Sequence, residues 1–215
     1  MRTIFISDIH GNYTKFMELL KSIKYTEQDT LILGGDYFDR GKENVKMVEW
    51  LIENHNKDNI HLIRGNHDDF MIDLFKGNHE MYEFNYKYNG FNETIKQLIY
   101  PNRYYDPVRA GNLIRLRYPE LPGIMNNLIN YIEIDNVIYT HGSYTDEDSD
   151  KGWLEARWAR SDVFAKENTF DKTIVIGHWM MGDEPIQIRN VIFCDGNFMS
   201  GKGFAYIRNG KGELK

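Results

Sequence analysis

Five short apolar runs in this chain end beside a glycine and a side chain that can bind a metal ion. They cover residues 3–6, 31–33, 60–63, 137–140 and 173–176, and their length and composition are typical of buried strands. Apolar residues spaced as on one face of a helix lie at 16–23 and 45–52, between the first three runs. A βαβαβ order of this kind predicts an α/β fold with a sheet flanked by helices.

The polar residues that follow the five runs are candidate metal ligands. They are Asp8, His10, Asp36, Asn66, His141 and His178. Loops beyond the carboxyl ends of strands form the ligand crevice of an open α/β sheet, and glycine lets the backbone approach closely there. Oxygen ligands mixed with imidazoles suit manganese, iron or zinc. We therefore expect these side chains to converge on one metal-binding site.

The candidate ligands outnumber the four that one tetrahedral ion uses. Two divalent ions about 3.5–4 Å apart that share a carboxylate would use them all, and would clamp the attacking and leaving oxygens of an in-line displacement. We expect Asp36 to be the shared carboxylate and a hydroxide held between the ions to be the nucleophile. The sequence thus predicts a site for two divalent metal ions, with Mn²⁺ as the expected pair and Fe or Zn as alternatives.

The composition predicts one globular domain over residues 1–215, because 41% of the residues are apolar and 27% are charged. A net charge of −6 argues against stable binding of nucleic acid. The N-terminal segment reaches Asp8 and His10 without the long apolar stretch of a signal peptide or a membrane span, and a single cysteine, Cys194, excludes an internal disulfide. We therefore expect a cytoplasmic protein without a membrane partner.

Residues 78–121 lack strand signals and are rich in Tyr, Asn and Arg, so we interpret them as a helical insertion. The tyrosines between Tyr82 and Tyr105 fit either a substrate-binding lid or amphipathic packing. The final quarter returns to strand patterns at 190–194 and 203–208, and we expect these two strands to pair antiparallel. His55, His61 and His79 lie outside the motifs and are assigned no function.

Three sequence blocks carry a family resemblance. They read S-D-I-H-G at 7–11, G-D-Y-F-D-R-G at 35–41 and G-N-H-D at 65–68. With this order and spacing the chain resembles the calcineurin-like metallophosphoesterase superfamily. Within it, the chain is similar to the phosphoprotein phosphatase family and its compact bacterial and bacteriophage serine/threonine phosphatases of the lambda type. Ser7 replaces the first glycine of the family's G-D-x-H-G block, and Trp179 stands where the family usually has threonine.

The resemblance implies a four-layer α/β/β/α sandwich, in which two sheets lie between helices. It also implies a distribution of the ligands over two metals. The first metal would be bound by Asp8, His10 and Asp36, and the second by Asp36, Asn66, His141 and His178. Many phosphodiesterases of the superfamily carry G-H-x-H near the end of the domain. Here the residue two positions after His178 is Met180, which favours the phosphatase branch.

Four further residues are expected to act on the substrate. His67 would protonate the leaving group as an imidazolium, with Asp39 as its orienting partner by the family pattern. Arg40 would donate two hydrogen bonds to phosphate oxygens, with Asn66 also on the substrate side. The family's W-x-R stretch is similar to residues 158–160, so we expect Arg160 to be the second phosphate ligand, with Arg157 as the alternative.

The preferred function is a metal-dependent phosphatase of serine/threonine protein phosphatase type, which hydrolyses phosphoserine or phosphothreonine in proteins and also simple aryl phosphates. The enzymatic alternative is a symmetrical dinucleoside tetraphosphate hydrolase, since diadenosine tetraphosphatases resemble the same motif set. Removal of terminal or cyclic phosphates from RNA during repair is disfavoured because the chain lacks a basic stripe. A non-enzymatic interaction module predicts missing ligands, and every expected ligand is present.

Overall fold

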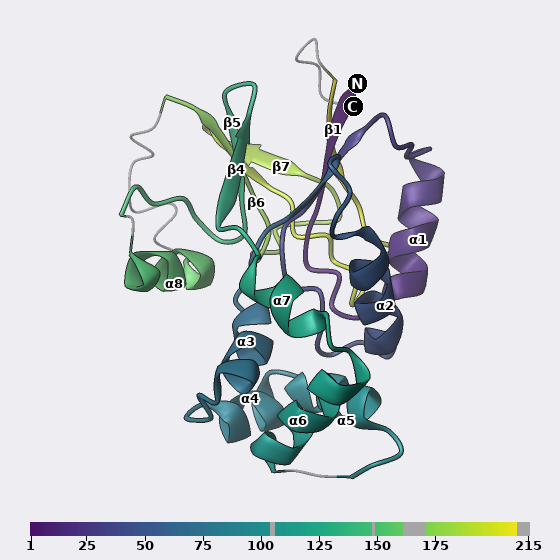
Figure 1. Cartoon of the computed structure of the whole chain (residues 1–215). Coiled ribbons are helices and arrows are strands. Elements are labelled where there is room, and N and C mark those ends of the chain that lie inside the picture. The colour runs from purple at the N-terminus through teal and green to yellow at the C-terminus, as the bar shows by residue number, and fades with distance from the viewer. Residues whose placement is uncertain (104–105, 148, 161–170, 210–215) are drawn as a thin grey trace.

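A computed structural model describes residues 1–103, 106–147, 149–160 and 171–209 of the chain (Figure 1). The first of its two sheets contains β1 (Arg2–Ile6), β2 (Thr30–Leu33), β3 (Ile60–Leu62) and β9 (Tyr206–Asn209). Its strand order is β3-β2-β1-β9. The first three strands of the chain run parallel, and β9 pairs antiparallel with β1.

The second sheet has the order β4-β5-β6-β8-β7. Its strands are β4 (Tyr131–Ile134), β5 (Val137–Thr140), β6 (Thr173–Ile176), β7 (Ile186–Ile188) and β8 (Val191–Phe193). The central strands β5, β6 and β8 are parallel, and the edge strands β4 and β7 are antiparallel to their neighbours. Both sheets therefore have a parallel group whose carboxyl ends can meet at one edge.

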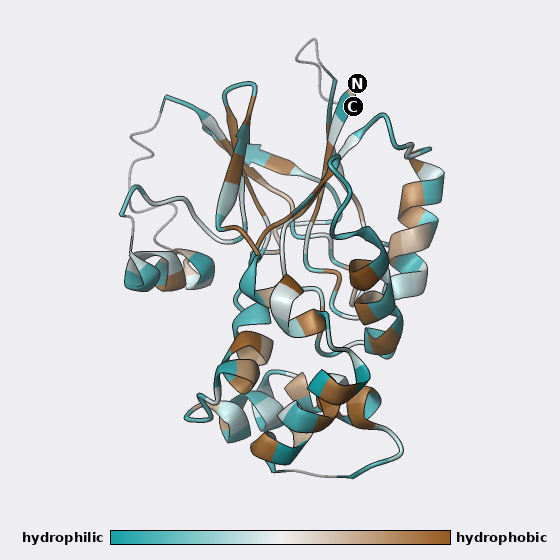
Figure 2. Cartoon of the chain, viewed as in Figure 1, coloured by the Kyte–Doolittle hydropathy of each residue, from teal (hydrophilic) through white to brown (hydrophobic). Residues whose placement is uncertain are grey.

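Alternating side chains explain why the two sheets pack against each other. In β1, Phe5 packs with Tyr139 and Val175 of the second sheet, whereas Ile4 and Ile6 face the other way. This alternation follows from the two-residue period of a strand, which sends successive side chains to opposite faces. Figure 2 shows hydrophobic residues along the strands of both sheets. The predicted α/β fold with two sheets and flanking helices is confirmed.

Helices α1 (Tyr13–Ser22) and α2 (Asn44–Asn54) cover the outer face of the first sheet. Between β3 and β4 the chain forms α3 (Asp68–Lys76), α4 (Tyr82–Tyr88), α5 (Phe91–Ile99), α6 (Pro107–Arg117) and α7 (Leu121–Asn126), which lie together below the sheets in Figure 1. The apolar faces of these helices share one buried cluster with β1, β2 and the two helices on the sheet. Helix α8 (Asp150–Trp158) packs at the edge of the second sheet, where Trp153 stacks on Tyr131 at 5.4 Å.

The segment interpreted as an insertion is helical over most of its described length, and Tyr105 of the tyrosine-rich stretch lies outside the described residues. Its role as a lid stays a prediction. None of the helices among the described residues is long and apolar enough to cross a membrane.

The expected antiparallel pairing of 190–194 with 203–208 is wrong. Strand β8 lies in the second sheet between β6 and β7, and β9 adds to the first sheet, with Arg208 opposite Thr3. The physical reason is a tight turn at Arg189, whose φ of 56° lets the chain reverse directly from β7 into β8. This local hairpin takes the antiparallel edge of β8, so β9 pairs with the free edge of β1 instead.

An ion pair between Arg2 and Asp29 ties β1 to the start of β2. The Arg2 guanidinium donates to both carboxylate oxygens of Asp29, at 2.9 and 2.6 Å, and to the backbone oxygens of Ile23 and Lys24 at the end of α1. The hydrogen bonds from Arg2 lower the pKa of Asp29 from its usual 3.8 to about 2. The charged form of Asp29 therefore stabilises the folded state.

Replacing Asp29 with asparagine is predicted to lower the free energy of unfolding at pH 7 by about 2 kcal/mol. Because the folded-state pKa is depressed, this stabilisation is present above pH 4 and is lost as the pH falls towards 2. Urea unfolding of the wild type and Asp29→Asn between pH 2 and 7 measures the difference. The exposed Asp58→Asn variant is the matched control. A difference that does not shrink at low pH would contradict the assignment.

Candidate functional site

The loops that follow the parallel strands meet in a seam between the two sheets. Here the loops after β1, β2 and β3 contact those after β5, β6 and β8. The backbone N–H of His178 donates to the Asp8 carboxylate at 2.8 Å, and the N–H of Gly196 donates to the Ser7 carbonyl at 3.2 Å. These hydrogen bonds join the carboxyl-terminal ends of both sheets. All six predicted metal-ligand residues lie in this seam and are buried.

Backbone conformations in the seam are unusual for residues with side chains. The residues with positive φ include Asp8, His10, Asp36, Asp39, Arg40 and His178, with values between 47° and 75°. Each such conformation costs on the order of 1–3 kcal/mol and persists only where the surroundings enforce it. Glycines allow the surrounding backbone to approach these residues closely. At Gly65, for example, a Cβ would lie 2.2 Å from the Asp36 Oδ1.

Asp68, at the start of α3, is a residue that the sequence analysis left without a role. Its fully buried carboxylate accepts hydrogen bonds from the backbone N–H groups of Asp36, Tyr37 and Gly65, at 2.9, 3.2 and 2.8 Å. It thereby fastens the loop after β2 to the loop after β3. The signal that could have found it is its place at the end of the G-N-H-D block.

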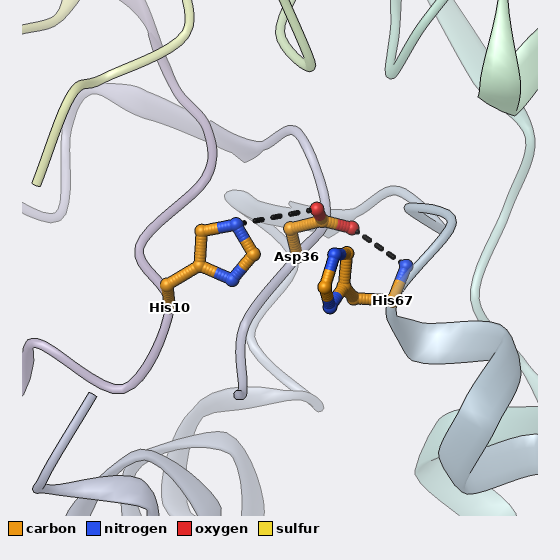
Figure 3. A group of neighbouring side chains, drawn as sticks. All are labelled: His10, Asp36 and His67. Carbon is orange, nitrogen blue, oxygen red and sulfur yellow. Dashed lines mark hydrogen bonds and ion pairs between the residues drawn. The ribbon is translucent and has the colours of Figure 1, made fainter. Parts of the chain in front are cut away.

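One end of the site is formed by His10 and Asp36 (Figure 3). The His10 Nε2 lies 3.5 Å from the Asp36 Oδ2. Its other ring nitrogen donates to the Phe38 carbonyl at 2.8 Å, so the Nε2 lone pair faces the site. Asp8 accepts two hydrogen bonds on Oδ2, from the Ser7 hydroxyl at 2.6 Å and from the His178 N–H, which leaves its Oδ1 for another ligand.

The other end is formed by His141, His178 and Asn66, again with Asp36. The His141 Nε2 lies 3.5 Å from the Asp36 Oδ1 and 2.8 Å from the Asn66 Oδ1. Its Nδ1 donates to the Gly34 carbonyl at 2.7 Å, which directs the Nε2 lone pair into the site. Ligand atoms of Asp36, His141 and His178 lie within 4.8 Å of one another. Asp36 therefore belongs to both ends of the site.

The charges of the seam fit divalent cations. Burial raises the pKa of Asp8 to about 6 and that of Asp195 to about 7, and it raises the pKa of Asp36 well above the usual value. Burial also lowers the pKa of His10 and brings that of His141 to about 4, so these imidazoles are neutral. Crowded carboxylates with neutral imidazole lone pairs are a donor set that a divalent metal ion stabilises.

His67 lies between Asp39 and Arg40. Its Nδ1 donates to the Asp39 Oδ2 at 2.8 Å, and its Nε2 accepts from the Arg40 guanidinium at 2.8 Å. A second nitrogen of Arg40 donates to the His10 Nε2 at 2.7 Å. The contact expected between His67 and Asp39 is present in the structure.

A compact group of potential metal-ligand atoms is formed by His10, Asp36 and His67, and Asp8 does not belong to this group.

The two arginines considered for phosphate binding differ in their surroundings. Arg160 is exposed, and its Nε lies 3.3 Å from the His178 Nε2. Arg157 is 5% exposed and is held by the Asp69 carboxylate at 3.0 Å and by the Asn130 amide oxygen at 3.1 Å. Because its guanidinium already makes these buried contacts, Arg157 is less suited than Arg160 to bind a phosphate.

A cavity of about 360 Å³ opens above the metal-ligand residues. Both Arg40 and Arg160 line it, together with His67 and the exposed Trp158. The cavity is larger than a phosphate group needs and is within the range of small-molecule sites. Its wall also includes Asn89, which joins α4 to α5, and Asp195, which follows β8. Neither residue was predicted from the sequence, although the Asp-Gly pair at 195–196 repeats the signal of the other loops.

Comparison with curated proteins gives short matches. The chain is 38% identical over 66 residues to a symmetrical bis(5'-nucleosyl)-tetraphosphatase of Buchnera aphidicola subsp. Acyrthosiphon pisum (strain 5A). It is 39% identical over 64 residues to a zinc-dependent endopolyphosphatase of Saccharomyces cerevisiae (strain ATCC 204508 / S288c). These matches cover 30% and 29% of this chain, and only 23% and 19% of the relatives' own lengths.

Solved structures share the fold over most of the chain. A putative diadenosine tetraphosphatase superimposes with a TM-score of 0.64 at 19% identity, over 100% of this chain and 91% of its own. A cold-active protein-tyrosine phosphatase of a psychrophilic Shewanella gives 0.61 at 17% identity, over 96% and 74%. A protein serine/threonine phosphatase from Saccharomyces cerevisiae gives 0.56 at 17% identity, over 94% and 70%.

The match to a protein family covers more of the chain than the matches to curated proteins do. The profile of the calcineurin-like phosphoesterases matches residues 1–198, a span that includes every residue assigned above to the seam between the sheets. Members of such a metallophosphoesterase family hydrolyse phosphoesters with divalent metal ions, in agreement with the grouped His and Asp side chains of this site. This chain belongs to the calcineurin-like phosphoesterase family.

Proposed function

We propose that this protein is a phosphatase that hydrolyses phosphate monoesters at a centre of two divalent metal ions. The observation that carries the proposal is the position of Asp36. One of its carboxylate oxygens lies 3.5 Å from the His10 Nε2, and the other lies 3.5 Å from the His141 Nε2. A carboxylate between two sets of imidazole lone pairs is suited to bridge two metal ions.

The ligands proposed for the two metals follow from this arrangement. Asp8, His10 and Asp36 would hold the first ion, and Asp36, Asn66, His141 and His178 the second. When bound, the ions supply an activated water and neutralise the charge on the phosphate. The hydrogen bonds from His10 to Phe38 and from His141 to Gly34 hold both rings in the tautomer that binds metal. Mn²⁺ is the proposed pair.

The remaining polar groups of the cavity would act on the phosphate and on the leaving group. Arg40 and Arg160 would bind the phosphate oxygens, with the Asn66 amide on the same side. Substrate phosphate would draw Arg40 away from the His67 Nε2, and that nitrogen would then take up a proton from solvent and donate it to the departing oxygen. Asp39 would keep the ring in the required orientation through its bond to Nδ1.

Two substrates are proposed. Phosphoserine or phosphothreonine in proteins is favoured by the motif pattern, which lacks the second histidine of many phosphodiesterases. Symmetrical dinucleoside tetraphosphates are the second candidate. They are supported by the 38% identity to nucleosyl-tetraphosphatases over 66 residues, and by the ring of Trp158 in the cavity wall, against which a nucleobase could stack.

Activity measurements with three substrates test the proposed reaction. Metal-stripped protein is predicted to be inactive on p-nitrophenyl phosphate, a phosphothreonine peptide and diadenosine tetraphosphate, because its ligands alone activate no water. Addition of Mn²⁺ is predicted to restore phosphate release from the first two. Preference for the dinucleotide would shift the function to the second candidate, and failure to hydrolyse any of the three would contradict the proposed phosphatase.

Replacement of Asp36 by asparagine is predicted to remove the bridge between the metals. The turnover should fall below about one tenth of the wild-type value, because an amide cannot balance two cations. Mn²⁺ at about 100 times the dissociation constant of each site should stabilise the wild type by about 2.7 kcal/mol per site, which corresponds to roughly 5–10 °C in Tm for each ion bound. Scanning calorimetry of Asp36→Asn should show little of this shift, whereas Asp58→Asn should keep it. Retained turnover or an unchanged shift would overturn the bridging role.

The role of His67 is predicted to depend on the leaving group. His67→Asn should lower kcat for phenyl phosphate on the order of 100-fold, because a poor leaving group needs protonation. The loss for p-nitrophenyl phosphate should be only a few-fold, since p-nitrophenolate departs without a proton. Steady-state kinetics with both esters measures the ratio, and His55→Asn serves as the control outside the site. Equal losses on the two esters would argue against a general acid.

A further inference from the structure

We propose that Thr94, on helix α5, positions the general acid by holding Asp39, the carboxylate that orients His67. This inference rests on the acid role proposed for His67. Thr94 lies outside the sequence blocks of the phosphoesterase pattern, within the segment interpreted from the sequence as a helical insertion. Its side chain hydrogen-bonds to Asp39 and, among the described residues, to none of the proposed metal ligands.

The contacts run from Thr94 to His67 in two steps. The Thr94 hydroxyl donates to the Asp39 Oδ1 at 2.5 Å and accepts from the Asp39 backbone N–H at 2.9 Å. The other oxygen of Asp39, Oδ2, accepts from the His67 Nδ1 at 2.8 Å. Both carboxylate oxygens are therefore used, one by the threonine and one by the imidazole. With Oδ1 fixed, the carboxylate cannot rotate without losing a hydrogen bond.

The backbone of Asp39 explains why such a fastening is needed. Its φ is 75°, in the left-handed region that a residue with a side chain rarely adopts. Thr94 is completely buried and Asp39 is 1% exposed, so water cannot replace the hydroxyl. The Asn44 side chain shares the Asp39 N–H at 3.0 Å, but among the hydrogen bonds of the described residues it has none to the Asp39 carboxylate. Among the described residues, the Thr94 side chain is thus hydrogen-bonded to both the backbone and the carboxylate of Asp39.

Neighbouring residues of α5 fasten the same loop. The Gln97 amide donates to the Gly41 carbonyl at 3.0 Å and accepts from the Asn44 N–H at 2.8 Å. Just before the helix, the Gly90 carbonyl accepts from the Arg40 N–H at 3.2 Å. The first turns of α5 therefore form a brace, defined as Gly90, Thr94 and Gln97, along the loop that carries Asp39 and Arg40. These contacts favour a fixed support over a moving lid for this part of the segment.

A merely structural threonine would have different consequences from a positioning residue. Loss of a buried hydroxyl that only supports packing would lower stability, or lower turnover equally for every substrate. Loss of a hydroxyl that orients the acid should matter most for substrates whose leaving group needs a proton. The dependence of kcat on the leaving group therefore distinguishes the two roles.

The test compares Thr94→Val, which keeps the shape and removes the hydroxyl, with Thr94→Ser, which keeps the hydroxyl. With Mn²⁺ present, Thr94→Val should lower kcat for phenyl phosphate roughly tenfold and for p-nitrophenyl phosphate less than about twofold, since a misoriented acid forfeits part of its contribution. Thr94→Ser should restore the phenyl phosphate rate. Thr3→Val, at a buried threonine of β1 away from the seam, is the control. Thr94→Ala replaces the valine variant if that variant does not fold.

A double variant tests whether Thr94 acts through His67. In the background of His67→Asn, the added Thr94→Val change should cause no further leaving-group-dependent loss, because the group it positions is gone. Losses that simply multiply would overturn the proposal, as would an equal loss on both esters or no loss at all. If His67→Asn itself shows no leaving-group dependence, the acid role of His67 fails. If His67→Asn shows a leaving-group dependence and Thr94→Val does not, the acid role of His67 stands and the positioning role of Thr94 fails.

Discussion

The buried carboxylate of Asp36 is the group on which the rest of the site depends. It lies in the seam between the two sheets, where burial and the neighbouring Asp8 carboxylate raise its pKa. Its backbone has a φ of 57°, and its N–H donates to Asp68, while its Oδ1 accepts from the His67 N–H at 2.9 Å. A carboxylate in such a place is stable only with fixed hydrogen bonds and a source of positive charge. The fold supplies the fixed hydrogen bonds, and bound metal ions would supply the positive charge.

The arrangement of the sheets brings the other groups to this carboxylate. Each sheet has parallel strands whose carboxyl ends point to the seam, and the alternation of side chains along β1 and β6 buries one face of each sheet against the other. Glycines stand where the backbones of these loops approach closely, as at Gly35, where a Cβ would lie 2.4 Å from the Gly65 nitrogen. Helices α3 and α5 complete the frame, because Asp68 and Thr94 hydrogen-bond to the loop after β2.

Local patterns made the central strands and the candidate ligands predictable. The runs that became β1, β2, β5 and β6 carry a strong strand signal, and the residues after them occur in a recognisable order. Contacts between distant segments left no such signal. The partner of β9 depended on the hairpin that joins β7 to β8. The roles of Asp68, Arg157 and Thr94 depended on contacts across the fold, such as the one between Thr94 and Asp39, which are 55 positions apart in the sequence.

The dinuclear centre can be tested by diffraction from crystals grown with Mn²⁺, recorded at a wavelength where manganese scatters anomalously. Two anomalous peaks about 3.5–4 Å apart are expected, with the Asp36 carboxylate between them. His10 should bind one ion, and His141 and His178 the other. A single peak, or a pair of peaks that Asp36 does not bridge, would contradict the proposed dinuclear centre.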